Sequence, residues 1–162
     1  GARTPVYPVP VDAGQTDPVH RWLVAGALIE GEGGLLLVRN RRRGGREDWS
    51  TPGGVIDAGE TVLEGLAREV REETGIDCEI TGLVGIYTDP KHVLLYTSDG
   101  EVRQEFSVVF TARAVGGQPT PSSESRAVEW VDREDVLALP MHRSMRLRVQ
   151  HFLENRPTPH LG

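Results

Sequence analysis

Residues 61–74 form the segment that most constrains how this chain can fold. Apolar side chains recur there at intervals of three and four residues, the spacing that lines one face of an α-helix. They are Val62, Leu63, Leu66, Ala67 and Val70. A helix with a single apolar face gains most of its stability by burying that face against another layer. The segment therefore predicts a helix docked on a sheet.

Both ends of this predicted helix are marked in the sequence. Thr61 precedes Glu64 by three residues, the spacing at which a threonine caps the first turn of a helix. Gly75 follows the last periodic residue, where glycine commonly ends a helix. Upstream, residues 51–54 read Thr-Pro-Gly-Gly and break the chain sharply. The helix is thus expected to lie between two glycine turns.

The rest of the chain mixes strands with a few helices. Apolar runs separated by a glycine turn predict a hairpin from residues 22–29 and 35–38. The remaining expected elements are a polar loop at 39–48, strands at 76–87 (with a break near Gly82), 102–114 and 127–131, and helices at 132–139 and 144–155. This mixture predicts an α/β sandwich.

The length of 162 residues allows one domain with a proper core and hardly two. Residues 1–19 are rich in Pro, Asp and Gly and have no apolar period, so an extended or disordered arm is expected there. The domain itself is expected over residues 20–155, followed by a C-terminal tail at 156–162.

Charge and composition exclude several classes of protein. A net charge of -6 and a pI near 5.4 argue against a general nucleic-acid binder, which would be basic. No apolar run approaches the roughly 20 residues that span a bilayer, so no membrane partner is expected. Cys78 is the only cysteine, which rules out an internal disulfide and favours a reducing, cytoplasmic setting.

Three carboxylates lie close together on the predicted helix. Glu69 is three residues from Glu72 and four from Glu73, and such positions lie side by side on a helix. Like charges repel, so this grouping favours a bound cation, and hard divalent ions take such oxygen ligands. The alternative from the residues alone is a solvated helix with a ladder of salt bridges. Because the glycine turn lies next to the carboxylates, the metal reading also suggests phosphate chemistry.

The sequence from residue 54 to 76 resembles the Nudix box. The fixed positions of that motif fall on Gly54, Glu60, Arg68, Glu69, Val70, Glu72, Glu73, Gly75 and Ile76. The strand order around it also resembles the Nudix fold, which implies an α/β/α sandwich with a mixed β-sheet. The resemblance implies a hydrolase of diphosphate bonds that depends on Mg²⁺ or Mn²⁺ and acts on a small nucleoside diphosphate derivative.

The resemblance also assigns roles to residues of the box. Glu69, Glu72 and Glu73 would bind the metal, with the carbonyl of Gly53 as a further ligand. Arg68 would orient a box carboxylate. Either Glu69 or Glu72 would take a proton from the attacking water.

Residues outside the box are weaker candidates. Glu124, six residues before Trp130, is either a further acidic ligand or base, or an exposed loop residue. Arg39 suits bidentate phosphate recognition. Further candidate substrate contacts are Tyr87, Asp89 and His92, which are expected to line the cleft opposite the box, and Arg103. Arg103 shares one face of a strand with Glu105, and a cross-strand ion pair is the favoured alternative for these residues.

Three functions remain open from the sequence. The leading one is hydrolysis of ADP-ribose or a similar compound, because residues 85–90 (Gly-Ile-Tyr-Thr-Asp-Pro) resemble a stretch of ADP-ribose-cleaving Nudix proteins. The second is a MutT-like hydrolysis of oxidised nucleoside triphosphates, which the position of Glu124 supports. The third is a sensor module without activity. The resemblance leaves a homodimer open.

Overall fold

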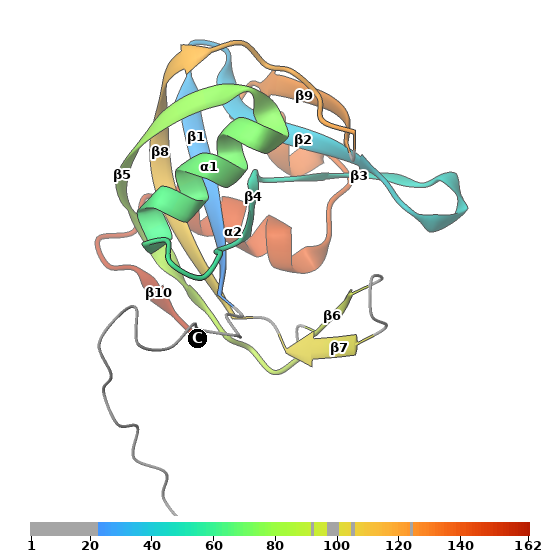
Figure 1. The fold of residues 1–162 in the computed structure, drawn as a ribbon, viewed down its shortest axis with the longest axis vertical. Coiled ribbons are helices and arrows are strands. Elements are labelled where there is room, and N and C mark those ends of the chain that lie inside the picture. The colour runs from blue at the N-terminus through green and yellow to red at the C-terminus, as the bar shows by residue number, and fades with distance from the viewer. Residues whose placement is uncertain (1–22, 92, 97–100, 105, 124) are drawn as a thin grey trace, which may run out of the picture.

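A mixed β-sheet forms the centre of the fold in a computed structural model of the chain, which describes residues 23–91, 93–96, 101–104, 106–123 and 125–162. Strand β1 (Val24–Gly31) lies in its middle (Figure 1). It runs parallel to β8 (Ser107–Gly117) and antiparallel to β2 (Gly34–Arg41) and β4 (Gly53–Val55). The sheet therefore joins segments from both halves of the sequence.

The other strands extend this sheet or form a separate hairpin. The sheet order is β10–β5–β8–β1–β2–β3, and β9 pairs with β2. Strands β6 and β7 pair with each other in a second sheet, which projects from the domain in Figure 1. The bounds are β3 (Glu47–Ser50), β5 (Ile76–Tyr87), β6 (Val93–Tyr96), β7 (Glu101–Gln104), β9 (Ser125–Val131) and β10 (His160–Leu161).

Two helices cover opposite faces of the main sheet. Successive side chains of a strand point to opposite faces, and Leu36 packs with the core under α1 (Val62–Thr74), whereas Leu35 and Leu37 pack with α2 (Arg143–Leu153). In Figure 1, α1 crosses in front of the sheet. The predicted α/β/α sandwich with a mixed sheet is confirmed.

The caps of α1 match the sequence prediction. The Thr61 hydroxyl accepts a hydrogen bond from the backbone amide of Glu64 at 3.2 Å. Gly75 has a φ of 76°, and its amide donates to the carbonyl of Arg71 at 2.9 Å. Because these caps fix where α1 begins and ends, they also fix which side chains lie on its acidic face.

Several predicted elements differ from the structure. The helix expected at 132–139 is only a 3-10 turn, η2 (Val136–Ala138), and the chain is already extended at Leu139, the residue before Pro140. The single strand expected at 102–114 is two strands, β7 and β8. The loop expected at 39–48 is largely a hairpin, in which β2 and β3 are joined through η1 (Arg43–Gly45). The expected break near Gly82 is a bulge within β5.

The C-terminal segment is part of the sheet. Residues 156–162, expected as a tail, include β10, which pairs in parallel with Gly85 and Ile86 of β5. The arm expected at 1–19 lies outside the described residues. Within the described part of the chain, neither α1 nor α2 is long and apolar enough to cross a membrane.

Candidate active site

Arg68 lies at the centre of the acidic face of α1. Its Nε and Nη2 donate to the two carboxylate oxygens of Glu60 at 2.7 and 2.9 Å. Its Nη1 donates to Glu69 at 3.0 Å and to Glu72 at 3.1 Å, and Nη2 also reaches the carbonyl of Val55 at 3.3 Å. The hydrogen bonds to Glu60 and then to Glu69 raise the pKa of Arg68, although burial opposes that shift. The guanidinium also lies 3.3 Å from Asp57, so one arginine contacts four carboxylates.

Glu69 is the more enclosed of the two carboxylates on α1 that Arg68 contacts. Its side chain is 23% exposed, against 61% for Glu72. Burial raises the pKa of Glu69, although Arg68 opposes that shift. A Cβ at Gly54 would lie 2.5 Å from both Cδ and Oε2 of Glu69. The glycine therefore lets strand β4 approach the carboxylate directly.

Glu73 lies where two cavities meet. Its Oε2 accepts a long hydrogen bond from the amide of Gly53, at 3.4 Å. One cavity of about 270 Å³ is lined by Glu69, Glu72, Glu73, Ser122 and Ser123. A second, of about 190 Å³, is bounded by Glu73 and Gly53 and extends to Arg148 of α2. The predicted metal residues are thus brought to one region of the molecule.

The donors in this region suit a hard divalent cation. Such ions take carboxylate and backbone carbonyl oxygens, and the two glycines leave the backbone of β4 without side chains in the way. Among the described residues, no three acidic, histidine or cysteine side chains are already grouped closely enough to hold a metal. A physical reason is that Glu69 and Glu72 form ion pairs with Arg68, which direct their carboxylates toward the arginine and not toward a common point.

Arg148 lines the cavity beside Glu73, although no pattern in the sequence pointed to it. Its side chain is only 4% exposed and lines the smaller cavity together with Gly53, Glu73 and Met145. Burial lowers its pKa to about 10, so it remains charged at neutral pH. The sequence shows only an arginine in a helix rich in arginine. What distinguishes Arg148 is its place on the buried face of α2, beside the buried Val149.

Tyr87 lies in the core on the α2 side and not at the acidic cavity where it was expected. It is buried, and its hydroxyl forms a hydrogen bond with Nδ1 of His151 at 2.8 Å. Its ring stacks on His160, with centroids 4.8 Å apart, and the Arg148 guanidinium lies over it at 5.4 Å. Burial raises the pKa of Tyr87 to about 12. Tyr87 is therefore in contact with a cavity residue without lining the cavity itself.

Arg39 is engaged within its own hairpin. It belongs to β2, where its Nε is 3.5 Å from Glu47 and its Cζ is 5.8 Å from the Trp49 ring centroid. It lines neither of the two cavities around Glu73. The contacts described for Arg39 therefore fit a structural ion pair better than the predicted phosphate contact.

The remaining predicted site residues all follow β5 in the sequence. The Asp89 carboxylate accepts a hydrogen bond from the amide of Lys91 at 2.9 Å, which stabilises the turn after β5. Arg103 pairs through its backbone with Leu94 in the small hairpin of β6 and β7. His92 and Glu124 lie outside the described residues.

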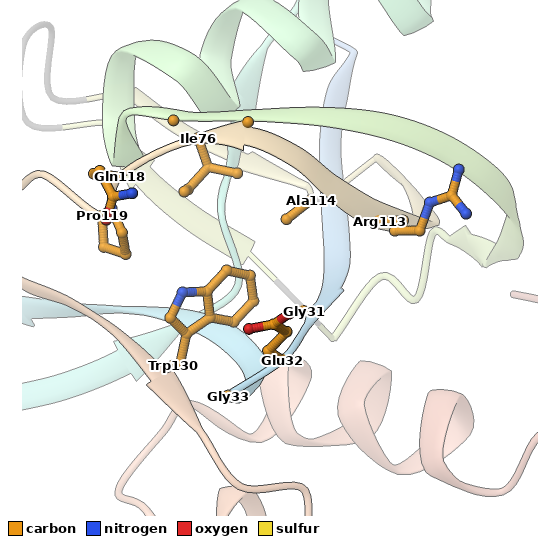
Figure 2. A pocket seen from close by; sticks show the side chains of 11 residues that line it. Gly31, Glu32, Gly33, Ile76, Arg113, Ala114, Gln118, Pro119 and Trp130 are labelled. Carbon is orange, nitrogen blue, oxygen red and sulfur yellow. The ribbon is translucent and has the colours of Figure 1, made fainter.

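A separate cavity of about 870 Å³ lies at the turn between β1 and β2 and the ends of β5 and β8. In Figure 2, the Trp130 indole and the Ile76 side chain point toward each other across it, whereas the Arg113 guanidinium points away. Arg113 instead donates to Glu79 at 2.8 Å. None of the predicted site residues lines this cavity, so it is distinct from the acidic region.

Comparisons with known proteins give a consistent result. The family model described as the NUDIX domain matches residues 20–152. A MutT-like protein of Streptomyces ambofaciens is 39% identical over 119 residues, which cover 74% of this chain and 68% of that protein. An ADP-ribose pyrophosphatase of Methanocaldococcus jannaschii is 28% identical over 118 residues, covering 73% and 66%. The chain thus spans about two thirds of the length of these relatives.

The fold is shared with solved structures as well. An ADP-ribose pyrophosphatase from Streptococcus suis superposes with a TM-score of 0.64 at 27% identity, covering 86% of this chain and 95% of that one. The similarity therefore extends over most of the domain and well beyond the motif in α1.

Proposed function

This chain belongs to the Nudix family of hydrolases, and we propose that it cleaves the diphosphate of a nucleoside diphosphate linked to another group, with ADP-ribose as the lead substrate. The observation that carries the proposal is the packing of Glu69 against Gly54, next to Glu73 at the junction of two cavities. Two relatives described above are named as ADP-ribose pyrophosphatases, which supports that choice of substrate.

The proposed cofactor is Mg²⁺ or Mn²⁺, in keeping with the general use of divalent metals by Nudix hydrolases. Glu69, Glu72, Glu73 and the carbonyl of Gly53 would hold it. When bound, the metal neutralises the diphosphate and lowers the pKa of the attacking water.

The residues of the chain have separate tasks in this proposal. Arg68 holds Glu69 and Glu72 in position through its hydrogen bonds to both. Glu69 or Glu72 accepts the proton of the water that attacks phosphorus. Gly54 keeps room for the Glu69 carboxylate beside β4. In this proposal, a base and a charged surface lie on the same side of the substrate.

One observation favours a second candidate, the hydrolysis of oxidised nucleoside triphosphates. Ser122 and Ser123, which immediately precede Glu124, line the acidic cavity. A carboxylate supplied from this segment would serve as an additional ligand or base. If it does, Glu124→Gln lowers kcat by about tenfold or more. An unchanged kcat, measured with saturating substrate and metal, would mean that Glu124 is a loop residue without a role in catalysis.

A substrate screen in Mg²⁺ and in Mn²⁺, with products identified by chromatography, tests both candidates. ADP-ribose hydrolysis yields AMP and ribose phosphate, whereas hydrolysis of a nucleoside triphosphate yields a nucleoside monophosphate and pyrophosphate. Preferential formation of the first pair is expected. If no diphosphate compound is turned over with either metal, the proposal fails and the sensor module takes its place.

A further inference from the structure

Arg148 brings a positive charge into the interior beside the acidic region. The arginine is buried and lies on α2, and its guanidinium lies over the Tyr87 ring at 5.4 Å. Tyr87 in turn is held by its hydrogen bond to His151. The ring and the helix therefore fix the direction in which Arg148 reaches toward the sheet.

A short series of contacts connects Arg148 with Glu73. A Cβ built at Gly26 would lie 3.8 Å from Nη1 of Arg148. Gly26 of β1 is the direct partner of Gly53 in β4, and neighbouring strands lie about 5 Å apart. The amide of Gly53 donates to Glu73. Between the Arg148 guanidinium and Glu73 there is thus little more than the backbone of Gly26 and Gly53, which carry no side chains.

The cavity between them is small and is lined by charges of both signs. It measures about 190 Å³, and Glu73, Arg148 and Arg42 all line it. A buried cation in surroundings of low dielectric is strongly attracted to an anion. Arginine also presents two parallel donors that match the oxygens of a phosphoryl group. An oxyanion is therefore the ligand that suits the part of this cavity beside Arg148.

We propose that Arg148 binds a phosphoryl oxygen of the substrate's diphosphate from the α2 side of the cavity, while the box carboxylates act on it from the α1 side. The proposal rests on the proposed function, because it places the diphosphate at the junction of the two cavities. It makes Arg148 a substrate-binding residue whose affinity for an oxyanion does not need the metal.

The test is the affinity of the protein for inorganic pyrophosphate in the presence of a chelator. Calorimetry or the line width in phosphorus NMR measures that affinity. Arg148→Met is expected to weaken binding by about tenfold or more, the scale of a hydrogen bond to a charged group. The matched control is Arg143→Met on the same helix, because Arg143 is exposed and lines neither cavity. Its affinity is expected to equal that of the unmodified chain.

Two further variants keep the test informative if Arg148→Met folds poorly. Arg148→Lys keeps the charge without the paired donors and is expected to bind with intermediate affinity. Gly26→Ala adds a methyl group at ordinary contact distances of 3.7 to 3.8 Å, so the fold is retained while the cavity narrows beside Arg148. Weaker pyrophosphate binding at an unchanged melting temperature is expected for Gly26→Ala.

Equal affinity in the unmodified chain and Arg148→Met, or no pyrophosphate binding by either, overturns the proposal. A change in preference among nucleobases with unchanged pyrophosphate binding also overturns it, because Arg148 would then contact the base. Failure of the proposed function looks different: substrates are not hydrolysed, whatever the result with pyrophosphate.

Discussion

Glu69 shows how several neighbours place a single carboxylate. Arg68 holds one oxygen at 3.0 Å, the helix fixes the direction of the side chain, and Gly54 leaves the space into which the carboxylate fits. The box pattern predicts Arg68 and Gly54, since both belong to the same motif of residues 54–76 as Glu69. The structure adds the physical reason for glycine at position 54. Its backbone lies so close to the Glu69 carboxylate that a side chain would not fit.

Gly54→Ala is predicted to lower activity without unfolding the protein. The new methyl group would meet the end of the Glu69 side chain, which can turn away, so the fold adapts while the carboxylate moves. Because a displacement of about 1 Å can cost about a hundredfold in rate, we expect kcat to fall by at least about tenfold.

The matched control is Gly116→Ala, where the nearest atom would lie at an ordinary 3.6 Å and the cavities around Glu73 are not involved. Comparable rates for the two variants, with equal melting temperatures, would show that Gly54 has no role in placing Glu69.

Arg148 and Tyr87 show what the sequence could not predict at this scale. Arg148 is more than 70 residues from the box, and only the docking of α2 on the sheet brings it near Glu73. Tyr87 was expected to line the cleft opposite the box. Its ring points to the opposite face, where it meets His151. Contacts between distant segments depend on which face each side chain takes, and local patterns do not determine that face at the end of a strand.

At the scale of elements, α1 was the most predictable part of the chain. Its apolar stripe, Thr61 and Gly75 are all local signals, and each has the expected role in the structure. The prediction of a helix at 132–139 was wrong for an equally local reason, since Pro140 allows only a short 3-10 turn before α2 begins.

Gly75→Ala is predicted to destabilise the fold. Gly75 has a φ of 76°, a left-handed conformation that costs other residues about 1–2 kcal/mol. A Cβ there would also lie 2.6 Å from the backbone oxygen of Gln118, which cannot move aside easily. We expect the free energy of unfolding in urea to fall by at least about 1 kcal/mol. A variant as stable as the unmodified chain would contradict this account of how α1 ends.

At the scale of the whole molecule, a stack of rings joins three separate elements. Tyr87 of β5, His151 of α2 and His160 of β10 lie together, with centroids of the two histidines 4.4 Å apart. The C-terminal strand is thereby held against the core that supports Arg148. The sequence predicted a tail there, because two residues of strand give too short a pattern to recognise.

This cluster predicts that stability falls as the pH drops below neutral. Burial, followed by Arg156 and His160, lowers the pKa of His151, while Glu154 opposes the shift. The unfolded chain therefore takes up the proton first, near the ordinary histidine value of about 6.5, and stability is lost as the pH falls through that value.

Thermal melting at several pH values between 7.5 and 5.5 checks this prediction. His151→Gln keeps an acceptor for the Tyr87 hydroxyl but does not titrate, so its melting temperature should depend less on pH than that of the unmodified chain. Parallel curves for the two proteins would mean that His151 does not contribute to the pH dependence.

The central claim is that the carboxylates around Glu69 and Glu73 support metal-dependent cleavage of a diphosphate. Its most direct test is the rate of ADP-ribose hydrolysis at saturating Mg²⁺ in Glu69→Gln and Glu73→Gln, which keep side-chain size and remove the charge. Each is predicted to lose about a hundredfold or more in kcat, or roughly 2.7 kcal/mol of transition-state stabilisation, with the fold intact by circular dichroism. Hydrolysis at the unmodified rate in either folded variant would contradict the account.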